Sequence, residues 1–178
     1  MKILEKLINR SFILFSLLVV AALSAQNISG KSYKIVVSGT SPLHDWDMTS
    51  TSATFTGTVS GNAITNVKFV MAAKNLKSTK GKMMDNKAYK ALKADTAPNF
   101  TFTAASLPLG KSNISGKLTI AGVTKNVTLP VNVVKNGNNY QITGSDSMKM
   151  SDFGMETPGF LGVHTGDAVT ASVNIVAN

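Results

Sequence analysis

Alternation of apolar and polar side chains in residues 116–134 constrains the fold of this chain more than any other feature. Leu118 and Ile120 are each flanked by polar residues, and the same spacing returns in residues 127–134 after a short turn at Gly122. Residues two positions apart on a strand lie on the same face of a sheet. The segment therefore predicts an antiparallel hairpin with one dry face and one wet face.

The same two-residue period recurs along most of the chain. Phe100 and Phe102 alternate with threonines, and the apolar residues in 168–176 share one face. Turns at Gly61 and Gly137 are suited to joining consecutive strands. The predicted strands are residues 33–37, 43–48, 53–59, 64–72, 99–104, 114–120, 127–134, 140–144, 148–150 and 168–176.

One segment departs from this pattern. Residues 82–93 carry Met84, Ala88 and Leu92 at helical spacing, with Asp85 placed to interact with the positive end of a helix dipole. Many short strands and one helix suit an antiparallel barrel or a two-sheet sandwich. We predict an all-β, mostly antiparallel barrel of about eight strands, with one short α-helix near residues 82–93.

The N-terminus has the pattern of an export signal. Basic residues up to Arg10 precede an apolar run, and small residues end at Ala25. The apolar run is shorter than the ~20 residues of a spanning helix, which favours cleavage over a retained anchor. We predict a signal peptide at residues 1–25, one domain at residues 26–178, and a periplasmic or secreted location.

Composition excludes several classes of function. The chain has no cysteine, which excludes thiol catalysis, thiolate metal sites and a cysteine-linked lipid anchor. Its net charge is +9, and every cationic residue after Arg10 is lysine. Proteins that bind nucleic acids generally use arginine for bidentate contacts, so nucleic acid is not an expected partner.

Lysines are concentrated in residues 74–93, around the predicted helix. One interpretation is a solvated helix face that keeps the protein soluble. The other is a basic rim that attracts a phosphate head group or makes transient contact with an anionic membrane surface. The sequence leaves both open.

A set of short motifs occurs in a fixed order along the chain. They are residues 38–46, 76–78, 84–85, 89–92, 98–102, 116–130, 150–154 and 166–170. This set resembles the YceI-like family of bacterial polyisoprenoid-binding proteins over residues 31–176, and residues 43–46 resemble a branch common in Bacteroidetes. The resemblance implies an exported, extended lipocalin-like barrel that holds a long apolar chain in a tunnel and has no catalytic residues. It implies a class of ligand, such as isoprenoid or fatty-acyl molecules, rather than one ligand.

Inward positions mix large apolar residues with small ones, namely Gly57, Ala104, Gly116 and Ala171. This mixture predicts free space inside the barrel, although the flexible methionines suit either an adaptable pocket or a filled core. Residues 153–164 resemble a loop that covers or plugs the barrel mouth. The candidate tunnel residues are Trp46, Phe55, Phe69, Met71, Phe102, Leu118, Val131, Met148, Phe153, Phe160 and Ala171.

The two histidines, His44 and His164, are candidate polar contacts at the tunnel mouth. The groups of a nucleophilic site are present in Ser41, His44 and Asp45. Adjacent strand residues point to opposite faces, however, so His44 and Asp45 are not expected to share a pocket. A metal site of His44, His164 and Asp167 has suitable ligand types and no supporting spacing. A structural role for His44, with Trp46 packed into the barrel, is the simplest interpretation.

Together these observations predict a binding protein rather than an enzyme. Its expected partner is a long-chain isoprenoid or fatty-acyl amphiphile, bound without a cofactor by a monomer or homodimer. The alternatives are a metal- or histidine-dependent hydrolase that uses His44 and His164, and a ligand-free, stress-protective structural protein.

Overall fold

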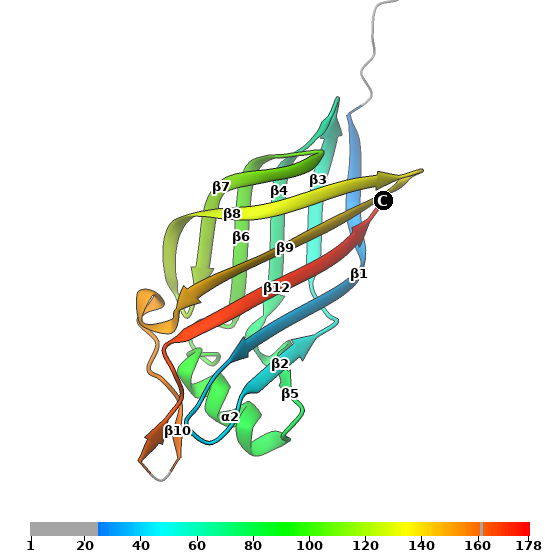
Figure 1. Ribbon diagram of the computed structural model, residues 1–178. Helices are drawn as coiled ribbons and strands as arrows, with labels where there is room; N and C mark the ends of the chain where they lie inside the picture. Colours follow the sequence, from blue (N-terminus) through cyan, green and yellow to red (C-terminus); the bar gives the residue numbers. More distant parts are fainter. Residues whose placement is uncertain (1–24, 161) are drawn as a thin grey trace, which may run out of the picture.

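The computed structural model describes residues 25–160 and 162–178, so the predicted signal peptide lies outside the described residues except for Ala25. Eight antiparallel strands close into a barrel (Figure 1). They are β1 (Gln26–Gly39), β3 (Thr54–Ser60), β4 (Ala63–Ala72), β6 (Asn99–Pro108), β7 (Gly110–Ile120), β8 (Val123–Asn136), β9 (Asn139–Lys149) and β12 (Ala168–Ala177).

The strand order around the barrel is β12-β9-β8-β7-β6-β4-β3-β1, and β1 pairs with β12 to close the circle. Consecutive strands are mostly neighbours because short turns join them. The turn between β7 and β8 has positive φ at both Ala121 (50°) and Gly122 (82°). Such a two-residue turn matches the right-handed twist of the flanking strands. The predicted all-β antiparallel barrel and this hairpin are confirmed.

The remaining elements gather mainly at one end of the barrel, called the helical end from here on. They include β2 (Trp46–Ser50), η2 (Ala73–Asn75), β5 (Lys77–Ser78) and α2 (Lys82–Ala91). One edge of β1 is shared, because Gln26–Ser29 pair with β3 and Ile35–Gly39 pair with β2. Figure 1 shows α2 beside β2 and β5 at this end, and the C-terminus at the opposite end.

A short connection between β9 and β12 also lies toward the helical end (Figure 1). It contains η3 (Met150–Phe153), β10 (Gly159–Phe160) and β11 (Val163–His164). In residues 25–160 and 162–178, no helix is long and apolar enough to cross a membrane.

Two sequence predictions of elements are corrected. The strands predicted at residues 140–144 and 148–150 are one strand, β9, because its pairing with β12 continues without a break from Tyr140 to Lys149. The strand predicted at residues 43–48 begins only at Trp46. Before it, the Ser41 hydroxyl donates to the backbone oxygen of His44 at 2.7 Å, which fixes a turn.

The core is divided into two clusters. One surrounds the fully buried Phe55, Ile64 and Val133, and the other contains Met48, Met71 and Phe100 near the helical end. Residues of both clusters border an open space inside the barrel, among them Phe55 of the first cluster and Met71 of the second.

The mixture of large and small inward residues predicted free space, and a cavity is present, but most of the small residues do not border it. A Cβ atom on Gly57 would lie 2.4 Å from the Ile64 methyl carbon Cγ2, and one on Gly116 would lie 2.5 Å from the Phe102 ring. A neighbouring side chain therefore occupies the room that each glycine provides. Of the four small residues predicted to leave space, Gly57, Ala104 and Gly116 do not line the cavity, whereas Ala171 does.

Candidate functional site

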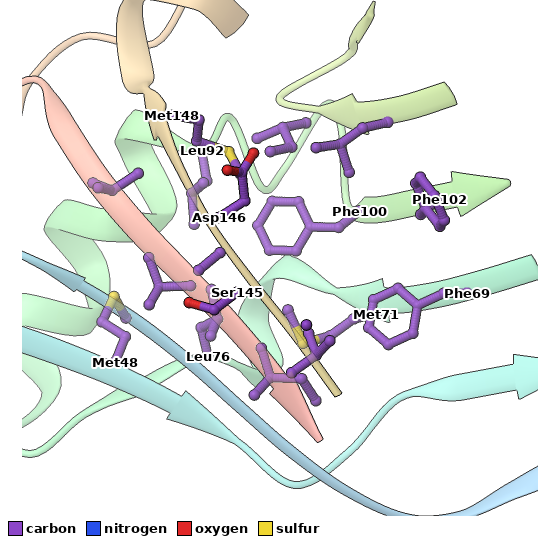
Figure 2. Close-up of a pocket in the computed structure, with 18 of the residues that line it drawn as sticks. Met48, Phe69, Met71, Leu76, Leu92, Phe100, Phe102, Ser145, Asp146 and Met148 are labelled. Carbon is purple, nitrogen blue, oxygen red and sulfur yellow. The ribbon is translucent and has the colours of Figure 1, made fainter. Parts of the chain in front are cut away.

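An apolar cavity of about 260 Å³ extends from α2 into the barrel (Figure 2). A packed protein interior has few voids larger than one water molecule, which takes ~30 Å³ in the liquid. The barrel is therefore not packed solid. A cavity of this kind, with few polar groups, is the usual form of a site for an apolar small molecule.

The walls of the cavity come from strands that are far apart in the sequence. Figure 2 shows Phe69 of β4 with Phe100 and Phe102 of β6, and Met48 of β2 lies on another side. These side chains converge because the two-residue period directs alternate residues of each strand inward. Met148 of β9 adds a flexible thioether to the same wall.

The helix α2 closes the cavity at the helical end. Its apolar residues Met84, Ala88 and Ala91 line the space, as does Leu92 at its C-terminal end. This is the face that helical spacing in the sequence predicted. The apolar face of α2 is therefore part of the site rather than a cover over a filled core.

Two polar side chains hold α2 against β5. The Tyr89 hydroxyl donates to the backbone oxygen of Leu76 at 2.8 Å and accepts from Lys77 Nζ at 2.6 Å. The hydrogen bond to Tyr89 raises the pKa of Lys77. Asp85 is 8% exposed, and its Oδ1 accepts from the backbone N–H of Ser78 at 2.7 Å. These contacts fix the helix where it lines the cavity.

All the predicted tunnel residues except Phe153 and Phe160 line this cavity. Phe153 is 2% exposed and lies in η3, with Lys125 Nζ 5.8 Å from its ring centroid. Phe153 is not among the residues that line the cavity. The side chain of Phe160 lies outside the described part of the structure. The predicted residues on the wall are Trp46, Phe55, Phe69, Met71, Phe102, Leu118, Val131, Met148 and Ala171.

Neither His44 nor His164 lines the cavity wall, and their contact with a ligand at the tunnel mouth stays a prediction. Both are exposed. His44 Nδ1 lies 3.0 Å from the backbone oxygen of Asp45, and His164 Nδ1 lies 2.9 Å from that of Thr157. The Ser41 hydroxyl contacts the backbone of His44 rather than its ring, so these residues form no nucleophilic site.

The residues considered for a metal site make other contacts instead. Within residues 25–160 and 162–178, no three His, Asp or Glu side chains are grouped so that they could hold a metal ion. The Asp167 carboxylate accepts from the Ser151 hydroxyl at 2.6 Å and from the Ser151 N–H at 2.8 Å. These hydrogen bonds lower the pKa of Asp167 and tie the start of β12 to η3.

The sequence prediction missed several wall residues, among them Met48, Leu76 and Phe100. It also missed Asp146, a carboxylate on the cavity wall. The signal was present, because Asp146 falls in phase with Ile142 and Met148 on a two-residue period. Dividing β9 into two predicted strands concealed that phase.

With the fold and cavity established, comparison with known proteins identifies the class. The sequence profile of the YceI-like domain matches residues 26–177. The chain therefore belongs to the YceI-like family, as its motifs predicted. No protein with a curated description is significantly similar to it in sequence.

Solved structures share the fold at low sequence identity. BcnA of Burkholderia cenocepacia is 20% identical with a TM-score of 0.70, over 82% of this chain and 96% of BcnA. A polyisoprenoid-binding domain from Saccharophagus degradans, implicated in plant cell wall breakdown, is 12% identical with a TM-score of 0.68, over 85% of this chain and 97% of that domain. A Campylobacter jejuni YceI protein is 22% identical with a TM-score of 0.51, over 64% of this chain and 71% of that protein.

Proposed function

We propose that the protein binds, and carries or stores, an amphiphile with one long isoprenoid or fatty-acyl chain, and that it is a binding protein rather than an enzyme. The observation that carries this proposal is the apolar cavity inside a closed barrel. The similarity of fold to a domain described as polyisoprenoid-binding supports it. Branch membership within the family stays a prediction from residues 43–46.

Burial of the apolar chain is the driving force for binding. Each Å² of apolar surface removed from water contributes about 25 cal/mol before the costs of ordering the ligand are subtracted. The aromatic rings and methionines of the wall provide such a surface without a fixed pattern of hydrogen bonds. This chemistry selects for chain length and shape more than for one particular ligand.

The proposed location is outside the cytoplasm, either periplasmic or secreted. The signal-like pattern of residues 1–25 supports it. The lysines of α2 and of the segment before it support transient contact with an anionic membrane surface, where such a ligand would be collected or delivered. Monomer and homodimer are both compatible with this role.

Native mass spectrometry tests the function, on protein that is expressed from the full-length sequence and gently purified. We expect a mass that corresponds to a chain beginning at or near Gln26 with one lipid bound. A bound metal ion with hydrolytic activity would support the hydrolase alternative. A bare mass after purification and after incubation with lipid extract would support the ligand-free structural alternative instead.

A further inference from the structure

The wall of the barrel is interrupted between β8 and β9. The two strands pair from Asn136 and Asn139 as far as Val131 and Gly144. Beyond that point, β8 pairs only with β7, and β9 pairs only with β12. We call the place where they separate the slot; it is bordered by Leu129, Pro130, Ser145 and Asp146, all of which line the cavity.

Pro130 gives a physical reason for the slot. The side-chain hydroxyl of Thr143 in β9 donates to the backbone oxygen of Asn132 at 3.4 Å, so this oxygen is directed toward β9. Residues two apart on a strand direct their backbone groups to the same side, and Pro130 therefore also faces β9. Proline has no N–H to donate, so the ladder cannot continue past it on that side.

At the slot, the same residues border the inner cavity and a groove on the outer surface. By alternation, Pro130 and Ser145 belong to the outer face, and both are exposed, yet both also line the inner cavity. The same two residues border a shallow groove on the outside of the barrel. The other residues of that groove are largely polar and include Lys34, Lys111, Asn113, Asn132, Thr143, Ser172 and Asn174. An apolar interior and a polar exterior therefore meet at the slot.

Asp146 lies at this boundary, on the wall of the cavity. Figure 2 shows Asp146 and Met148 projecting from β9 into the space that faces Phe100. Asp146 is partly buried and pairs across the sheet with the small residue Ala171. Within residues 25–160 and 162–178 its carboxylate forms no hydrogen bond and no ion pair. A carboxylate that is partly removed from water is stabilised by a donor group.

We propose that Asp146 accepts a hydrogen bond from the polar head of the ligand at the slot. The ligand class that fits is an amphiphile whose head donates a hydrogen bond and is neutral or cationic, such as a long-chain alcohol or amine. This inference rests on the proposed function and specifies the chemistry of its ligand. A carboxylate or phosphate head beside Asp146 would be repelled by its charge.

The competing arrangement places an anionic head at the other side of the cavity. Lys87 of α2 lines the cavity and would attract a carboxylate or phosphate. The two arrangements predict opposite preferences between ligands with the same chain. Oleyl alcohol and oleate, which share one hydrocarbon chain, are therefore suitable probes.

The test measures dissociation constants of both probes for delipidated wild-type protein and for Asp146→Asn, at low micromolar probe concentration. A hydrogen bond to a charged group contributes enough free energy of binding that we expect wild type to prefer oleyl alcohol by about tenfold or more. Asp146→Asn should lose most of that preference, chiefly by binding oleate about tenfold more tightly. The control Asp152→Asn removes the same charge from η3, outside the cavity wall, and should keep the wild-type preference.

The outcomes separate this inference from the proposed function. The role of Asp146 would be overturned if wild type and Asp146→Asn bound each probe with the same affinity, or if wild type preferred oleate. Binding of the apolar chain would stand in either case. Failure of both probes to bind folded wild type would overturn both. Thermal melting of each variant establishes folding. As an independent check, we expect Asp146→Leu to bind methyl oleate as tightly as oleyl alcohol, and a retained preference for the alcohol would contradict the role of Asp146.

Discussion

Ala171 and Gly57 are both small residues at inward positions of barrel strands, but their surroundings differ. The space above Gly57 is occupied by Ile64, whereas Ala171 lines the cavity. Alternation in the sequence predicts which way each residue points, and it predicted both correctly. It does not predict whether a residue on another strand fills the space, because that depends on pairing register and rotamers across the barrel.

The variant Ala171→Phe should therefore fill the cavity and displace the ligand. We expect at least about a tenfold loss of bound lipid per mole of protein, with a melting temperature close to that of delipidated wild type, because an open space receives the ring without strain. Gly57→Ala is the matched contrast, and overpacking against Ile64 should destabilise it by about 1–3 kcal/mol while lipid content is kept. Unchanged lipid in Ala171→Phe, or a melting temperature well below that of delipidated wild type, would mean that the site is packed.

At the scale of elements, strands and the helix could be predicted where a single period extends over enough residues. Helix α2 was predicted as residues 82–93 and is observed as Lys82–Ala91. What sequence could not supply is how α2 is attached. Asp85 and Tyr89 reach the backbone of residues 76–78, and such contacts leave no periodic trace in the sequence.

Removing the Asp85 contact should loosen the helical end. Asp85→Ala leaves the N–H of Ser78 without its partner and removes a favourable charge in the first turn of α2, so we expect a loss of about 1–3 kcal/mol in the free energy of unfolding. Release of bound lipid should become several-fold faster. Asp95→Ala is the control, because its ion pair with Lys74 is exposed and should contribute no more than about 0.5 kcal/mol.

Denaturant titration and stopped-flow displacement of a fluorescent lipid measure the two effects. If Asp85→Ala were as stable as Asp95→Ala and released lipid at the wild-type rate, α2 would not control access to the cavity. The rate is the more informative quantity, since loss of stability alone would also follow from a purely structural role.

At the scale of the whole molecule, the barrel, the helix α2 and the family could be predicted from the sequence. Barrel closure follows because many strands with one dry face must bury those faces together. The slot could not be predicted in the same way. Pro130 is visible in the sequence, but its effect depends on which neighbour its backbone faces, and that is known only once the pairing with β9 is known.

A ligand that occupies the cavity only in the folded barrel should stabilise the whole molecule by mass action. At a free ligand concentration one hundred times the dissociation constant, the stabilisation is ~2.7 kcal/mol. For a domain of this size each kcal/mol corresponds to roughly 2–4 °C, so delipidated protein should melt about 5–10 °C lower and recover when the extracted lipid is restored. Differential scanning calorimetry on both forms measures this shift.

Ala171→Phe is the control and should show no shift between the two forms, since its cavity is filled. An identical melting temperature of the two wild-type forms would show that the cavity holds no stabilising ligand.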